Sequence, residues 1–72
     1  MEGVKTITVM PDIGTTVIFH YNDISTVIIN NEKKEYISVE IDMKNGTNWK
    51  YSMATAKCFL KQYNAIKDKE SN

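Results

Sequence analysis

Residues 36–67, YISVEIDMKNGTNWKYSMATAKCFLKQYNAIK, decide the fold of this 72-residue chain. Up to Tyr51, apolar residues occupy every second position, which is the period of a β-strand. Beyond Ser52 they recur every three to four positions, which is the period of an α-helix. This change of period predicts a set of strands closed by a single amphipathic helix.

The turn at Asn45 and Gly46 fixes how the two strands beside it pair. A two-residue turn would set apolar residues of one strand against polar residues of the other, which a sheet with one buried face does not tolerate. A three-residue loop of residues 44–46, with Gly46 left-handed in a bulge, avoids this conflict. The resulting pairs are Ile41 with Trp49, Val39 with Tyr51, and Glu40 with Lys50.

The rest of the chain supplies three earlier strands, separated by turn residues. Pro11 and Gly14 end the first strand, Asn22 and Asp23 separate the second from the third, and residues 31–34 form a polar loop. Ser52 is the predicted helix N-cap. The predicted strands are 4–10, 15–21, 24–30, 36–43 and 47–51, followed by a helix over 53–67 and a frayed polar tail at 68–72.

These elements predict one α+β domain over residues 1–72. Its architecture is a five-stranded antiparallel β-meander, a curved sheet or half-barrel, with the C-terminal helix on the concave side. One apolar stripe of the helix covers the sheet. The stripe consists of Met53, Ala56, Phe59, Leu60, Tyr63 and Ile66.

Charge and composition restrict the function. Nine basic residues, all lysines, balance nine acidic ones. The absence of arginine removes the bidentate fork that reads guanine and phosphate, which argues against nucleic acid as the partner. Cys58 and His20 are the only residues of their kinds, so we expect no disulfide, metal or cofactor. A chain this short often gains stability from a partner subunit, so we expect a homodimer.

The sequence also indicates where the protein works. Residues 1–9, MEGVKTITV, lack a signal-peptide pattern, and no apolar run approaches the length of a membrane span. We therefore expect a soluble cytoplasmic protein with no membrane partner. The excess of Lys, Ile and Asn is typical of an AT-rich genome and favours a small protein of a low-GC bacterium or its phage.

No group of residues predicts catalysis, so we expect a protein that is not an enzyme. Glu40 and Asp42 share a strand face at a spacing that an acid–base pair could use. They are predicted to face Lys50 and Asn48 instead, as solvated cross-strand pairs. Cys58 lies off the apolar stripe and is expected to be an unreactive thiol. With Ala54, Lys61 and Ala65 it forms a small-residue line, read as helix propensity or as an interface.

The second and third strands are apolar on both faces, through residues 17–19 and 27–29. With a four-residue loop at 31–34, Ile28 pairs with Ile37 on the inner face. The far face then carries an apolar patch, which predicts a protein-binding surface, for a partner protein or a second copy. Its predicted residues are Ile18, Val27, Ile29 and Tyr36. The alternative is a partial barrel with two buried sides.

A second function remains open, in which the chain binds single-stranded nucleic acid or a nucleotide. Lysines in the loops and on the fifth strand would contact phosphates, and Tyr36 would stack on a base. Trp49 and Tyr51 share the face of Ile41, so core packing is their expected use. The lysines are Lys33, Lys34, Lys44 and Lys50.

Residues 16–67, which include the YNDI sequence at 21–24, resemble the C-terminal part of bacterial pleckstrin-homology-like domains. The resemblance implies hairpin-linked strands and one helix that closes a half-barrel. The first hairpin loop, PDIGT at 11–15, lacks the Lys and Arg cluster that holds phosphoinositide head groups in that family, so lipid binding is not implied. The strands and helix are also similar to small coactivator-type single-strand DNA binders, against which zero net charge and the lack of arginine argue.

Overall fold

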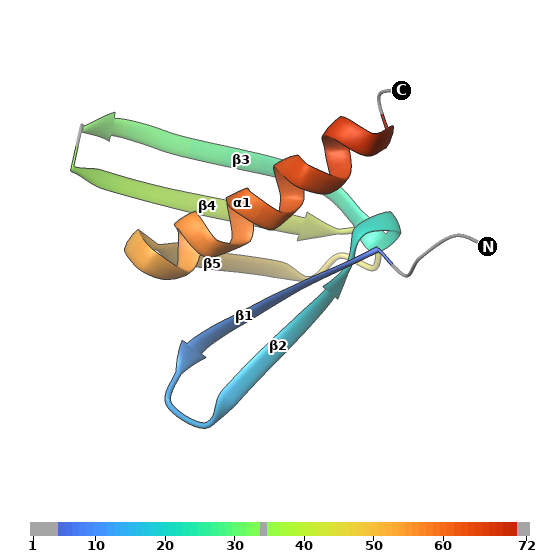
Figure 1. Ribbon diagram of the computed structural model, residues 1–72, viewed down its shortest axis with the longest axis horizontal. Helices are drawn as coiled ribbons and strands as arrows, with labels where there is room; N and C mark the ends of the chain where they lie inside the picture. The colour runs from blue at the N-terminus through green and yellow to red at the C-terminus, as the bar shows by residue number, and fades with distance from the viewer. Residues whose placement is uncertain (1–4, 34, 71–72) are drawn as a thin grey trace.

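The computed structural model describes residues 5–33 and 35–70 and shows five strands and one long helix (Figure 1). The predicted α+β class is confirmed. Val4, Lys34 and residues 71–72, predicted as strand, loop and tail, lie outside the described residues, as does the side chain of Glu32. The elements are β1 (Thr6–Asp12), β2 (Thr15–His20), the short 3₁₀ turn η1 (Tyr21–Asp23), β3 (Ile24–Lys33), β4 (Tyr36–Met43), β5 (Asn48–Ser52) and α1 (Met53–Glu70).

The strands form two antiparallel sheets, and the prediction of one continuous meander is wrong. β1 and β2 make a hairpin, and β3, β4 and β5 make a separate sheet in that order. The break falls at η1, which is fastened at both ends. Tyr21 N donates to Lys5 O at 2.9 Å, and Lys44 N donates to Asp23 O at 2.8 Å. The chain therefore leaves the hairpin at η1 and enters the second sheet beside the β4–β5 turn.

Pro11 lies inside β1 and does not end it as predicted. Ile7 pairs with Phe19 and Val9 with Val17, and the register then shifts before the hairpin closes. Proline has no N–H for the ladder, and an irregularity at this point accommodates that loss. Gly14 completes the turn with a φ of +83°, a conformation that glycine adopts without a steric penalty.

The β4–β5 hairpin has the predicted register, with Ile41 opposite Trp49 and Val39 opposite Tyr51. Its three-residue loop is closed by Met43 N, which donates to Thr47 O at 2.8 Å. Gly46 has the predicted left-handed backbone, with a φ of +94°. The alternation of apolar residues was therefore enough to fix this pairing.

The β3–β4 register differs from the prediction. Ile28 pairs with Glu40, and Ile29 pairs with Val39, so the expected Ile28–Ile37 pair is wrong. β3 continues to Lys33 and carries one extra residue between Asn30 and Lys33. The pairing thereby shifts by an odd number of residues, and each β3 side chain moves to the other face.

Helix α1 follows β5 without a loop. Ser52, at the predicted cap position, is also the last residue of β5 and faces Ser38. Met53 turns the chain with a φ of +55°, which costs a non-glycine residue roughly 1–2 kcal/mol. The helix extends to Glu70, so the tail predicted from residue 68 is helical where it is described. Its last turn carries Lys67 and Lys69, which suit the negative end of the helix dipole.

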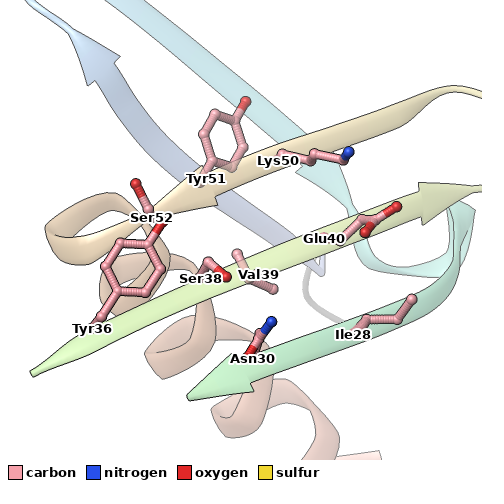
Figure 2. Close-up of a pocket in the computed structure, with 9 residues that line it drawn as sticks. All are labelled: Ile28, Asn30, Tyr36, Ser38, Val39, Glu40, Lys50, Tyr51 and Ser52. Carbon is pink, nitrogen blue, oxygen red and sulfur yellow. The ribbon is translucent and has the colours of Figure 1, made fainter. Parts of the chain in front are cut away.

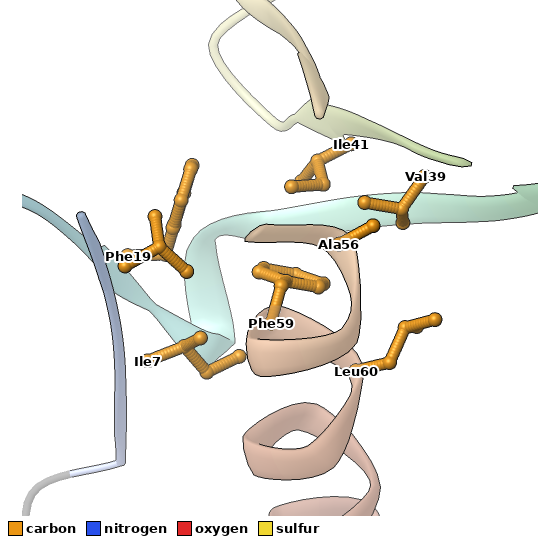
Figure 3. Close-up of a cluster of buried hydrophobic side chains, with 8 residues drawn as sticks. Ile7, Phe19, Val39, Ile41, Ala56, Phe59 and Leu60 are labelled. Carbon is orange, nitrogen blue, oxygen red and sulfur yellow. The ribbon is translucent and has the colours of Figure 1, made fainter. Parts of the chain in front are cut away.

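The core lies where the hairpin, the three-stranded sheet and the helix meet (Figure 3). Phe59 from α1 sits between the two sheets, and Phe19 packs edge-on against it with ring centroids 5.5 Å apart. Met53 is 44% exposed, so its place in the predicted core stripe is wrong. The buried residues are Ile7, Val9, Phe19, Val39, Ile41, Ala56, Phe59 and Leu60.

Candidate functional site

The face of the three-stranded sheet turned away from α1, called the outer face below, contains a hollow of about 330 Å³ (Figure 2). Alternation along the strands places the even-numbered lining residues on this face, opposite the core residue Ile41. Val39 and Tyr51 also border the hollow, although their side chains belong to the inner face. The hollow is lined by Ile28, Asn30, Tyr36, Ser38, Val39, Glu40, Lys50, Tyr51 and Ser52.

Two apolar side chains flank this hollow. Tyr36 lies at one end beside Ser52, and Ile28 lies towards the other end near Glu40 (Figure 2). Ile28 is 48% exposed and Tyr36 is 50% exposed, so no other part of the described chain covers either side chain fully. Between them stand the neutral hydrogen-bonding groups of Asn30 and Ser38. Protein-binding surfaces combine apolar side chains with hydrogen-bonding groups, and both kinds are present here.

The charged groups at the centre of the outer face are two carboxylates, of Glu40 and Asp42, and the ammonium group of Lys50. Glu40 and Lys50 are directly opposite each other, as predicted. Asn48 Nδ2 donates to Glu40 Oε2 at 2.9 Å and to Asp42 Oδ1 at 2.5 Å. The side-chain amide of Asn48 thus binds both carboxylates across the β4–β5 pair.

Of the four residues predicted to bind a partner, only Tyr36 lies on the outer face. Ile18 is exposed on the separate β1–β2 hairpin. Val27 is half-buried against the core, and Ile29 shares the inner face with Val39. Ile28 is the residue that the prediction missed, and its place follows from the β3–β4 register.

The observed and predicted β3–β4 registers both pair β-branched residues. The observed pairs join Val27 to Ile41 and Ile29 to Val39, and the predicted register joined Ile28 to Ile37, so side-chain type alone did not separate them. The predicted register followed from the predicted loop length. Loop length was a poor guide here because the extra residue lies within β3 itself.

The lysines proposed to bind nucleic acid do not come together. Lys33 lies at the β3–β4 turn and Lys44 at the β4–β5 turn, so the length of β4, roughly 25 Å, separates them. Lys50 lies on the outer face opposite Glu40, and Lys34 is outside the described residues. A continuous phosphate-binding stripe is not formed by the three lysines that the structure describes.

Trp49 and Tyr51 pack inwards rather than forming a stacking platform. Phe19 contacts both edge-on, with ring centroids 5.6 Å from Trp49 and 6.2 Å from Tyr51. The Tyr51 hydroxyl is buried and has no hydrogen-bond partner among the described residues. Burial also raises the pKa of Tyr51 above its ordinary value of 10.0. These rings therefore line the seam between the two sheets.

A second hollow of about 310 Å³ lies at the β3–β4 turn, beside the first turns of α1. Tyr36 borders both hollows, which makes it the one aromatic side chain shared by the two concave surfaces. The second hollow is lined by Asn31, Lys33, Glu35, Tyr36, Ile37 and Lys57.

The remaining candidates do not assemble into a reactive centre in the described part of the chain. No group of three or more His, Cys, Asp and Glu side chains converges there. Cys58 is exposed on α1, with its Sγ 3.8 Å from Thr8 O and 3.3 Å from Gln62 Nε2. Over the same residues, no helix combines the length and the apolar character needed to cross a bilayer.

Comparison with known proteins finds no family, no curated protein and no solved structure that matches the chain.

Proposed function

We propose that the protein is a non-enzymatic protein-binding module that binds an extended segment of a partner protein across the outer face. The observation that carries this proposal is the half-exposed pair Ile28 and Tyr36 on either side of one hollow. On the inner face of the same sheet, α1 packs mainly against β4 and β5. The outer face is turned away from α1, so its apolar side chains are available to a second molecule.

The polar groups of the hollow favour a peptide over a charged ligand. Asn30, Ser38 and Ser52 are neutral and can exchange hydrogen bonds with a peptide backbone. Lys50 and Glu40 compensate each other, so the hollow carries no net charge. A nucleic acid would need several unopposed cations along its path.

Selection from a phage-displayed library of random peptides tests the proposal. Peptides of about ten residues are long enough, because they span roughly 33 Å when extended. We expect selected peptides to bind the wild-type protein and to lose about 30-fold in affinity on Tyr36→Ala, because an anchor of this kind contributes roughly 2 kcal/mol. Ile28→Ala should weaken binding less, because it removes a smaller side chain.

Ile18→Ala is the matched control, since Ile18 is also exposed but lies on the other sheet. It should leave peptide affinity unchanged. Failure to select any binder, or binders that tolerate both Tyr36→Ala and Ile28→Ala, would contradict the proposal. Oligonucleotide binding that weakens steeply with added salt would instead favour the nucleic-acid alternative.

A further inference from the structure

The open edge of β3 is not covered by a neighbouring strand. β3 is an outer strand of its sheet, and α1 makes its main strand contacts with β1, β4 and β5. Residues 24–31, ISTVIINN, contain no proline and no charged side chain, which are the features that usually keep an edge strand from pairing with another chain.

The backbone groups that face this edge can be identified from the ladder. Met43 N donates to Thr47 O, so odd-numbered residues of β4 bond to β5 and even-numbered ones bond to β3. Glu40 pairs with Ile28, so Ile28 uses its backbone groups within the sheet. Val27 and Ile29 therefore direct their N–H and C=O groups outwards.

Apolar side chains are exposed on both faces beside these groups. Ile28 is half-exposed on the outer face, and Ile29, 47% exposed, projects on the inner face beyond the main contacts of α1. The outer strand of the hairpin differs, because Ile18 of β2 is exposed while its neighbour Phe19 is buried. Only a strand with apolar contacts on both faces can hold a new neighbouring strand from both sides.

We propose that β3 pairs with β3 of a second copy of the chain, antiparallel, about a two-fold axis at Ile28. This register sets Ile28 against its own copy on the outer face and Val27 against the copy of Ile29 on the inner face. Thr26 then faces the copy of Asn30. The four backbone groups of Val27 and Ile29 in each chain supply about four intermolecular hydrogen bonds in all.

The strand is self-complementary in this register. The regular segment lies between two register shifts, one at each end, so the pairing covers residues 26–30. No charge opposes a like charge within it. Asp23 of one copy and Lys33 of the other fall at the same end of the paired segment. Their side chains carry opposite charges.

The paired segment is short, so the dimer forms reversibly with concentration. The two sheets become one six-stranded sheet, and both outer faces lie on its same side with Ile28 at the centre. Pairing does not depend on peptide binding by the outer face, and the two proposals fail separately.

Light scattering across a concentration series, with amide hydrogen exchange, tests the pairing. We expect the mass to rise from 8.3 kDa towards twice that value as the chain approaches roughly millimolar concentration. The Val27 and Ile29 amides should become at least about tenfold better protected over the same range, since protection follows the paired population. The Ile28 and Asn30 amides, bonded within the sheet, should be protected throughout.

Ile29→Pro is the decisive variant. It removes an N–H that no intrachain bond uses, and proline is tolerated at such edge positions. We expect an unchanged circular dichroism spectrum, a mass of one chain at every concentration and unprotected Val27. Ile29→Val retains the N–H and should still dimerise.

A wild-type mass of one chain throughout would overturn the proposal, as would a dimer that persists in folded Ile29→Pro. Loss of the dimer in Tyr36→Ala but not in Ile29→Pro would also overturn it, because the copies would then meet through the outer face. Ile29→Lys, which places a charge against the copy of Val27 and diagonal to its own copy, gives a second test should the proline variant fail to fold. It should be monomeric, and a dimer in that variant contradicts the pairing.

Discussion

β1 and β3 are both outer strands, but the protein treats their free edges differently. Gln62 of α1 covers the β1 edge: Thr8 N donates to its Oε1 at 2.9 Å, and its Nε2 donates to Thr8 O at 2.7 Å. A side-chain amide thus takes the place of the peptide group of a neighbouring strand. No described side chain makes such bonds to Val27 or Ile29. The helix therefore closes the β1 edge and leaves the β3 edge available.

α1 also joins the β1–β2 hairpin to the three-stranded sheet. Phe59 contacts the hairpin through Phe19 and lies between both sheets (Figure 3). The hairpin has no strand pairing with the second sheet. Its position therefore depends on packing through α1 and on the bonds at η1.

Loss of the Phe59 packing between the two sheets should lower the free energy of unfolding more than any other change considered below. Phe59→Ala removes a fully buried ring and leaves a cavity between the sheets, at a cost of about 3–5 kcal/mol in the free energy of unfolding. For a domain of this size that approaches the whole stability. Thermal unfolding followed by circular dichroism should show loss of most or all of the cooperative transition. A loss below about 1 kcal/mol would show that the hairpin is held by other contacts.

Gln62→Ala is expected to have the next largest effect, because it converts the covered β1 edge into an open one. The two bonds to Thr8 are lost, each with a net value of about 0.5–1.5 kcal/mol. The weaker bonds from Nε2 to Cys58 O at 3.2 Å and Cys58 Sγ at 3.3 Å are lost with them, so we expect destabilisation of roughly 1–2 kcal/mol. The Thr8 amide should also exchange faster in hydrogen-exchange measurements.

Gln62→Glu provides the matched control. A carboxylate can accept from Thr8 N but cannot donate to Thr8 O or Cys58 O, so this variant loses stability and yet should retain protection of the Thr8 amide. Equal loss of Thr8 amide protection in both variants would mean that packing, and not the bond to the Gln62 side-chain oxygen, holds the edge.

The contrast between these edges was only partly predictable from the sequence. Alternation fixed the β4–β5 pairing because Gly46 and the apolar positions agreed on one register. The division into two sheets depends on η1, where residues 21–23 carry no signal that separates a strand turn from a change of sheet. Gln62 lay off the apolar stripe, so nothing local indicated that its amide would reach Thr8, 54 residues away. Tyr36 was predicted as a surface residue from its strand alone, whereas Ile28 depended on the extra residue in β3.

Tyr51→Phe tests the seam between the hairpin and the second sheet. Its buried hydroxyl lacks a partner among the described residues, and removing such a group relieves a cost of about 1 kcal/mol. We therefore expect the variant to be more stable than the wild type in urea denaturation at neutral pH. Destabilisation would show that the hydroxyl is hydrogen-bonded, for example to ordered water.

Tyr51→Phe should also change how the stability of the protein depends on pH in the alkaline range. Burial raises the pKa of Tyr51 in the folded state above 10.0, so the folded protein holds this proton more tightly than the unfolded chain does. The contribution of this proton to the free energy of unfolding is constant below pH 10.0. It is lost as the pH rises from there through the folded-state pKa. Wild-type stability should therefore fall more than that of Tyr51→Phe above this pH, and parallel curves would contradict burial of the hydroxyl.

The smallest expected effect concerns a second connection between α1 and the start of β1, the ion pair of Lys5 with Glu70. The Lys5 side chain is 31% exposed and that of Glu70 is 40% exposed, so solvent screens their attraction, and Glu70 lies at the unfavourable end of the helix dipole. Glu70→Gln should change the free energy of unfolding by less than about 0.5 kcal/mol, and the difference should shrink further in high salt. Urea denaturation at two salt concentrations measures it. A loss that matches that of Gln62→Ala would mean that charge, rather than the neutral amide at Thr8, fastens the helix to β1, and the two strand edges would then differ for an electrostatic reason.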